Sequence, residues 1–580
     1  MVCLARSKWS SHRTSALLVG VWLAACAARA EVVIEGVEDD IRDNVLAVMR
    51  LDDEACETPR RRVEQSFEAA TPQIHTALEA YGYYAAQIDR ALRFDESCWV
   101  AEFRITLGEV VRFRRVEVDI TGEASTDPAF SRLLQVNAIT PGEPLVHSRY
   151  ETLKSSLSSL ALERGYIDAT FGESRIDVFP SELAADVKLA LASGIRYRFG
   201  EIILEQSVLH DEFVEGFLQF KTGDYYDSRL LVQSRVDLFD SGYFNGIDIR
   251  PLAADAAQRT VPISIQLTPA PKRHIGYGLG FSTDTGPRVR FTRNIRRFNE
   301  SGHQLNFNAL LSPVVSEVVT NYRMPYGDPR TEWVSFDAGI KREDTETSES
   351  ESLQLSARRV LQERFGLTRT PYLSLVIEDF QVGDQTGRAR LLMPGMEWSR
   401  LNADSALRPR RGSRLIFEMR GAGDSLGSNT SFAQLIARGK WIWGLPRQSR
   451  LLIRGDLGRT WTDTIDELPP SVRFFAGGDN SVRGYEFETL GPTDENGEVI
   501  GGTRLLTMSV EIEYPVKRAW SVAAFADAGN AFDSSLDLQR GIGIGARWQS
   551  PLGPIRIDVA KPQDGPNRDL RLHISLGPDL

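Results

Sequence analysis

From residue 270 onward, apolar and polar residues alternate along the chain in short segments. In the segment 274–281, Ile275, Tyr277, Leu279 and Phe281 occupy alternate positions, separated by three glycines. The segments 541–548 and 570–577 repeat this pattern. Successive side chains of a strand point to opposite faces, so a period of two predicts strands with one apolar face. The alternation predicts an all-β region over residues 270–580.

The polar positions of these strands include charged residues, where a soluble β core would be apolar on its inner face. Connections alternate between short ones, such as 550–554, and long ones, such as the stretch after Trp461. Both features favour an antiparallel transmembrane β-barrel over a soluble β-sandwich or barrel, whose strands also alternate. At about 19 residues per strand and connection, this region accommodates about 16 strands. Beyond the N-terminus no apolar run is long enough for a spanning helix, so a membrane crossing requires a closed barrel.

The N-terminal half contains an internal repeat. A Gly-Tyr pair recurs where a predicted helix gives way to a predicted strand, at positions 82–83, 165–166 and 242–243. Glycine suits the position just past a helix. The spacing predicts three α+β units of order β-α-α-β-β, over residues 31–108, 109–195 and 196–269. A short repeat of this kind favours a docking arm over an active site, and a single irregular α/β domain is the alternative.

The first 30 residues have the composition of a signal peptide. A basic stretch with Arg6, Lys8 and Arg13 precedes an apolar stretch, and Ala28-Arg29-Ala30 fits a cleavage site. The rival reading is lipoprotein processing at Cys26. Removing residues 1–30 takes away four basic and no acidic residues, so the net charge falls from −11 to −15. This balance disfavours nucleic-acid binding.

Two cysteines remain after cleavage, Cys56 and Cys98, both in the first repeat. An exported protein lies in an oxidising compartment, where a disulfide between them is expected. Two free thiols are the alternative, since sequence does not show whether the side chains approach.

The segment 475–492 places Arg483 in a glycine-rich loop between predicted strands. Counting hairpins back from the C-terminus puts this loop on the extracellular side. Carboxylates are costly on a lipid-facing surface, so the strand phase turns Glu511, Glu513 and Asp527 inward. Arg483 meets one of these acids if the loop folds into the lumen, in a charge-assisted pair. A solvated arginine without a fixed partner is the alternative.

The core Val482-Arg483-Gly484-Tyr485, the stretch 525–529 and the stretch 541–562 resemble the BamA-type outer-membrane insertase superfamily. The resemblance implies a 16-stranded barrel with periplasmic POTRA repeats, and a loop arginine paired with Asp527 and Glu511. Three repeats and the LGPDL terminus are most similar to the TamA group, outer-membrane subunits of the translocation and assembly module. That similarity implies assembly, insertion or secretion of unfolded outer-membrane proteins, autotransporters among them. It also implies a TamB-like inner-membrane-anchored partner that engages residues 31–108.

The first and last predicted strands carry signals of weak closure. Gly276, Gly278 and Gly280 remove cross-strand packing from the first strand. At the other edge Gly577 precedes Pro578, which has no N–H to donate. We therefore expect a weak lateral seam, whose edge strands pair with a client strand.

Other functions lack support from the sequence. The Gly423–Gly427 segment, GDSLG, matches a hydrolase pattern but lies between two strand-like stretches, whereas a nucleophile elbow leads into a helix. The glycines of 541–545 lie along a strand, which disfavours dinucleotide binding. We expect no enzyme activity, cofactor or metal. A passive porin explains the barrel but not the repeats, and a two-partner-secretion-type transporter shares the loop motif.

Overall fold

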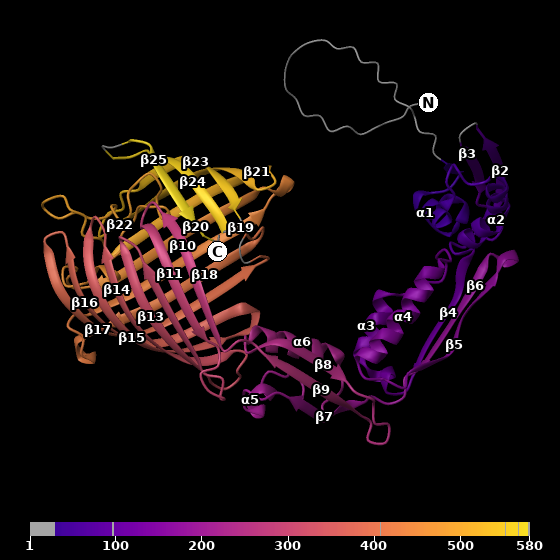
Figure 1. Ribbon diagram of the computed structural model, residues 1–580, viewed down its shortest axis with the longest axis horizontal. Helices are drawn as coiled ribbons and strands as arrows, with labels where there is room; N and C mark the ends of the chain where they lie inside the picture. The colour runs from indigo at the N-terminus through magenta and orange to yellow at the C-terminus, as the bar shows by residue number, and fades with distance from the viewer. Residues whose placement is uncertain (1–29, 96–97, 406–407, 551–552, 566–567, 578–580) are drawn as a thin grey trace, which may run out of the picture. The chain divides into compact units, whose positions relative to one another are not determined.

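The computed structural model describes residues 30–95, 98–405, 408–550, 553–565 and 568–577 (Figure 1). The signal peptide, Cys26 and Pro578 lie outside these residues. The chain forms two compact units: one of residues up to 198 with 225–228, and one of residues 199–224 with those from 229 on. The first unit contains repeats 1 and 2, and the second contains nearly all of repeat 3 with the barrel.

Repeat 1 is a three-stranded sheet covered by helices. In chain order it contains β1 Glu31–Glu35, α1 Asp39–Val48, α2 Arg60–Glu79, β2 Gln87–Phe94 and β3 Trp99–Thr106. The sheet order is β1-β3-β2, with β1 parallel to β3. Alternate residues of β3, Trp99, Ala101 and Phe103, are buried against Ile74 and Leu78 of α2, because strand and helix periods bring one apolar face of each together.

Repeat 2 has the same order. It contains β4 Arg112–Thr121, α3 Pro128–Val136, α4 His147–Glu163, β5 Thr170–Phe179 and β6 Ala184–Ala192. Asp127 caps α3, since its carboxylate accepts the Ala129 N–H at 3.0 Å. The recurring Gly-Tyr pair has a clear role here. Gly165 follows α4 with φ +86°, and Tyr166 is buried in the core.

Repeat 3 packs against one rim of the barrel. It contains β7 Arg198–Glu205, α5 Asp211–Glu215, α6 Ser228–Asp240, β8 Phe244–Pro251 and β9 Thr260–Pro269. Arg297, in a barrel turn, donates to the Tyr243 carbonyl at 2.8 Å, and His210 N–H donates to the Glu300 carbonyl at 3.0 Å. The three β-α-α-β-β units predicted from the Gly-Tyr spacing are therefore confirmed.

The barrel is closed and antiparallel, and neighbouring strands follow one another in sequence. Its 16 strands among the described residues are β10 Arg273–Ser282, β11 Gly286–Ile295, β12 Gln304–Leu311, β13 Val315–Pro325, β14 Glu332–Asp344, β15 Ser348–Gln362, β16 Leu367–Val382, β17 Gln385–Ala403, β18 Gly412–Ala422, β19 Phe432–Gly444, β20 Arg450–Thr462, β21 Arg504–Lys517, β22 Trp520–Phe532, β23 Gln539–Ser550, β24 Gly553–Pro562 and β25 Arg571–Leu576. This confirms the predicted fold class.

The strand phase of the C-terminal strands agrees with the sequence pattern. On β21, Met508, Val510 and Ile512 are each nearly half exposed on the outer face, whereas Glu511 and Glu513 are buried in the lumen. A soluble barrel would bury the apolar residues instead. Among the described residues, none of the helices combines the length and apolarity that a membrane crossing requires.

Connection lengths differ from the expectation. The rim next to repeat 3 (the repeat-side rim) includes the two-residue turn between β21 and β22. The opposite rim (the loop-side rim) has long connections after β18 and β20, but only two or three residues between β10 and β11 and between β16 and β17. The predicted alternation of short and long connections therefore holds only in the C-terminal half. Residues 423–427 lie in the β18–β19 connection, which leads into a strand and not into a helix.

Candidate functional site

The long loop after β20, residues 463–503, folds back into the barrel lumen and delivers Arg483 to the inner wall. The Arg483 guanidinium donates to both carboxylate oxygens of Asp527, at 2.7 and 2.9 Å. The backbone N–H of Arg483 also donates to Asp527, at 3.1 Å. The arginine is 5% exposed and Asp527 is 2% exposed. This is a buried bidentate pair, which fixes the loop in both position and orientation.

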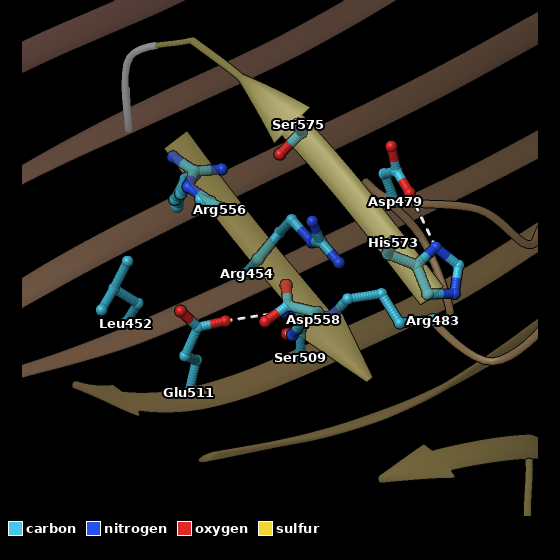
Figure 2. A pocket seen from close by; sticks show the side chains of 11 residues that line it. Leu452, Arg454, Asp479, Arg483, Ser509, Glu511, Arg556, Asp558, His573 and Ser575 are labelled. Carbon is cyan, nitrogen blue, oxygen red and sulfur yellow. Dashed lines mark hydrogen bonds and ion pairs between the residues drawn. The ribbon is translucent and has the colours of Figure 1, made fainter. Parts of the chain in front are cut away.

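Arg483 belongs to a larger ionic cluster, of which Figure 2 shows Arg483, Glu511 and Asp558. It also contacts Glu511 at 2.7 Å and Asp558 at 3.1 Å. A second arginine, Arg547 of β23, bridges the same two acids, with contacts of 2.7 Å to Glu511 and 2.6 Å to Asp558. Two guanidinium groups and three carboxylates thus hold the loop against four adjacent strands, β21 to β24.

Strand phase alone identified Glu511 and Asp527 in the sequence. Asp558 and Arg547 were missed as partners, although the same signal marks them. Asp558 is an inward acid between the outward residues Ile557 and Val559 of β24. Glu513, named as an inward acid, pairs with Arg450 of β20 and not with Arg483.

The rest of the loop motif fits closely against the strands. Val482 is fully buried. Gly484 has φ +103°, and a side chain there would meet the backbone of Pro562 at 3.0 Å. A side chain on Gly541 would approach the Arg483 carbonyl to 2.0 Å, so a glycine is needed in β23. The Tyr485 hydroxyl donates to the Asp564 carbonyl at 3.1 Å. The Arg483 guanidinium also lies 3.3 Å from the Phe525 ring centroid.

A second group of contacts connects the loop to both edge strands of the barrel. His573 of β25 bonds through Nδ1 to Asp479 of the loop at 2.7 Å, and its Nε2 accepts the Gly484 N–H at 2.9 Å. Asp479 in turn accepts hydrogen bonds from Ser282 and Thr283, at 2.7 and 2.8 Å. These residues, which we call the edge latch (Ser282, Thr283, Asp479 and His573), join β10, β25 and the loop. These four residues were not predicted from the sequence, where His573 on the polar face of the last strand was the one signal for them.

Asp284, in the turn after β10, lies beside the edge latch. Its carboxylate accepts the Asp479 N–H at 2.8 Å. Burial, and then the neighbouring charge of Asp479, raise the pKa of Asp284 to about 7. Asp284, Asp479 and His573 place their ligand atoms within 4.8 Å of one another. Both ring nitrogens of His573 already make hydrogen bonds, so a metal would have to displace one of them.

The seam between β10 and β25 is short. Within the described residues their register consists of one pair, Ser282 with Ser575, whereas β10 pairs with β11 over its full length. Thr283 N–H donates to the Ile574 carbonyl at 3.1 Å, and Arg288 donates to the Leu576 carbonyl at 3.0 Å. Among the described residues, most of the β10 edge, from Arg273 to Phe281, therefore has no strand partner on that side.

Four of the five residues predicted to weaken the seam lie in the described part of its two edges. Gly276, Gly278 and Gly280 of β10 are in register with Thr292, Arg290 and Arg288 of β11, and all three precede the pair of Ser282 with Ser575. β25 contains six residues and ends at Leu576, one residue before Gly577. The Gly577 N–H donates to the Pro554 carbonyl, across the β24 side. That these residues weaken the seam stays a prediction.

Cys56 and Cys98 form a disulfide in repeat 1. It joins the segment after α1 to the start of β3 and closes a loop with a sequence separation of 42 residues. The bond lies far along the chain from the loop and seam, and it stabilises the repeat at the N-terminal end.

Comparisons with known proteins agree with this architecture. The Omp85 superfamily domain matches residues 263–579, the first TamA-type POTRA domain matches 31–107, and a POTRA family described as a surface antigen variable number repeat matches 197–270. The outer membrane protein assembly factor BamA of Neisseria meningitidis serogroup B is 23% identical, over 86% of this chain and 71% of that protein.

Two further comparisons extend this. BamA of Nitratidesulfovibrio vulgaris is 23% identical over 73% of this chain, which spans only 56% of that relative. The crystal structure of BamA from Haemophilus ducreyi lacking POTRA domains 1–3 has a TM-score of 0.67 and 15% identity, covering 80% of this chain and 99% of that one. At that identity the structural likeness concerns the fold.

Proposed function

The chain belongs to the Omp85 superfamily, and from that premise we propose that it inserts β-barrel proteins into the outer membrane through its β10–β25 seam. Its own barrel lies in the outer membrane, and its repeats lie in the periplasm. The repeat-side rim therefore faces the periplasm, and the loop-side rim faces outside the cell. The BamA relatives are assembly factors for outer-membrane proteins by name.

The observation that carries this proposal is the unpaired edge of β10. Its residues from Arg273 to Phe281 offer backbone donors and acceptors at the membrane-facing wall, with no partner on that side among the described residues. An unpaired edge is normally a liability, because it templates pairing with another chain. In an insertase the same edge accepts a client strand by β-augmentation. The outward residues of β10, Tyr277 and Leu279, are each 81% exposed, so a client strand there is already next to lipid.

The loop stays attached to the inner wall of the barrel when the β10–β25 seam opens. Arg483 and Arg547 hold the loop on the strands that precede β25, and the edge latch holds it on β10 and β25. Opening the seam then requires breaking the few edge contacts, without displacing the loop from the rest of the wall. Client folding and burial of apolar surface in lipid supply the free energy, so the process needs no covalent step.

We further propose that the protein is a TamA-type subunit that acts on autotransporters and similar clients, with a TamB-like partner anchored in the inner membrane. The match of residues 31–107 to the first TamA-type POTRA domain supports this assignment. The outer strands β1 and β2 leave an edge of the repeat 1 sheet for an extended partner segment. Deletion of residues 31–108 should abolish co-purification of the partner, and unchanged co-purification would contradict this assignment.

A two-partner-secretion-type transporter is the alternative, because it also combines POTRA repeats with a barrel and an inserted loop. A transporter carries its substrate through the lumen, whereas the ion pairs of Arg483 keep the loop within it. Single-channel recording separates the two: we expect small, fluctuating conductance, and a large, steady conductance would favour a pore.

The direct test places a photo-reactive residue on the β10 edge. With this residue at Gly278, we expect crosslinks to unfolded barrel clients during insertion in intact cells. The same residue at Gly339 on β14, a strand paired on both sides, is the control and should give none. Equal crosslinking at both positions would mean that clients do not enter at the seam.

A further inference from the structure

A groove crosses the outer wall of the barrel on the side away from the seam. It is a cavity of about 580 Å3 spread over β16 to β21. Its walls carry large apolar side chains, with Trp398 and Phe417 on one side and Leu457 and Met508 on the other. The volume falls in the range of ordinary ligand sites.

Two glycines form the floor of this groove. Gly439 of β19 and Gly455 of β20 are register partners, so neither strand supplies a side chain at that point of the outward face. The Trp441 ring lies over Gly439, where an added side chain would meet it at 2.5 Å. At Gly455 an added side chain would meet only the Thr507 carbonyl, at 3.6 Å. The outward face is therefore open above Gly455.

The groove follows one row of register partners, which runs from Arg400 through Leu415, Gly439 and Gly455 to Met508. Four strand spacings make this row about 19 Å long. Because the strands tilt, the row also changes depth. Arg400 lies three residues from the periplasmic end of β17, whereas Met508 lies four residues from the outer end of β21. The groove thus rises from the periplasmic membrane surface toward the bilayer interior.

Arg400 gives the lower end of the groove a positive charge. It is exposed on the outward face, in register with the outward residue Leu415. Its guanidinium has no hydrogen-bond or ion-pair partner among the residues that the structure describes. An arginine facing lipid is unfavourable unless it reaches water or an anion. Trp398, which packs on Phe417 at 5.6 Å between ring centroids, places Arg400 at the level of interfacial aromatic residues.

We propose that this groove binds one phospholipid of the periplasmic leaflet, with its phosphate on Arg400 and an acyl chain across Gly439 and Gly455. Guanidinium groups match phosphate oxygens in charge and geometry. The depth of each end agrees with this orientation, because the charge lies at the membrane surface and the apolar floor lies within the bilayer. The lipid would be held for longer than the surrounding lipids, on the wall opposite the edge that opens.

The test uses the purified full-length protein in mild detergent, with phosphatidylglycerol added and bound lipid counted by native mass spectrometry. We expect one lipid that resists removal. Arg400→Gln removes the charge, and Gly455→Leu fills the floor, so each should weaken binding by about tenfold, the equivalent of about 1.4 kcal/mol. The control is Arg414→Gln. Arg414 lies one strand away in the lumen-facing row, in register with Lys440, and should bind lipid as the wild type does.

Two competitors separate the parts of the site. Diacylglycerol with the same chains lacks the phosphate, and inorganic phosphate lacks the chains, so neither should displace the bound lipid. Equal retention by wild type, Arg400→Gln and Gly455→Leu would overturn the proposal. If inorganic phosphate alone displaces the lipid, the site binds an anion and not a phospholipid. If diacylglycerol displaces it, the lipid phosphate does not contact Arg400. If Gly455→Leu does not fold, as judged by heat-modified electrophoretic mobility, Arg400→Gln decides the result. None of these readouts needs a client, so the outcome is independent of the proposed insertase function.

Discussion

The last strand of the barrel is held very differently on its two sides. In the part of the chain that the structure describes, β25 makes six register pairs toward β24 and one toward β10. The loop partly compensates, since His573 of β25 contacts both Asp479 and Gly484. Deeper in the lumen, the same loop is fixed by a buried cluster of two arginines and three acids. Among the described residues, the two edge strands are therefore joined by the hydrogen bonds of the edge latch through Asp479 of the loop, more than by backbone pairing with each other.

The first prediction concerns the ionic cluster in the lumen, whose loss should have the largest effect on stability. Arg483→Ala leaves Asp527, Glu511 and Asp558 buried with one arginine fewer, and we expect a loss of stability of about 3–5 kcal/mol. Chemical unfolding of the purified barrel measures this. The matched control is Arg540→Ala, which breaks the exposed pair with Asp564 and should cost about 0–1 kcal/mol. Equal losses in the two variants would show that the cluster does not fix the loop.

The second prediction concerns the seam. Extending the single register pair by one residue places Phe281 opposite Leu576 on the outward face, away from Asp479. A disulfide between cysteines at these positions should reduce client insertion at least about a hundredfold, a barrier increase of about 2.7 kcal/mol. Insertion into liposomes is measured before and after reduction.

The control disulfide joins cysteines at Ile340 and Leu353, an outward register pair within the closed wall. It should leave the insertion rate unchanged. Full-rate insertion with the seam locked would rule out the lateral mechanism for this protein.

The third prediction concerns the edge latch. His573→Ala leaves the Asp479 carboxylate and the Gly484 N–H each without one partner, which should destabilise the edge by about 1–3 kcal/mol. Hydrogen exchange in β25 should quicken accordingly, while exchange in β14 and β15 should not change. His303→Ala, which breaks a contact with Tyr322 of β13, is the control and should leave β25 as it is. Unchanged exchange in β25 of His573→Ala would mean that backbone pairing alone closes the edge.

The smallest expected effect is a pH dependence of the same edge. The folded protein raises the pKa of Asp284 to about 7, through burial and then the Asp479 charge. The stabilisation from protonated Asp284 is therefore present at low pH and is lost as the pH rises through about 7. Hydrogen exchange in β25, corrected for the intrinsic rate, should quicken modestly between pH 6 and 8. Asp284→Asn should remove this dependence, and a dependence that persists in Asp284→Asn would assign it to another group.

Much of the architecture follows from the sequence because it depends on local periodicity. A period of two identified the barrel strands, and the Gly-Tyr spacing identified the three repeats. Carboxylates are unfavourable toward lipid, so the phase of β21 and β22 alone turned Glu511 and Asp527 inward. The pairing of Arg483 with these acids was predicted only with the help of the family resemblance. A loop has no regular period, so its sequence does not indicate where it folds.

The remaining features depend on contacts between residues far apart in the chain. Asp479 and His573 are 94 residues apart, and Ser282 and Asp479 are 197 apart, so strand phase could not pair them. The seam shows the same limit. The period of two placed 274–281 and 570–577 in strands, but it could not give the register in which β10 and β25 meet, which among the described residues is the pair of Ser282 with Ser575. The periodicity of the sequence decides whether a strand residue faces the lumen or the lipid. Which distant residues come into contact is decided only by the closed barrel, because closure depends on the register and length of every strand around it.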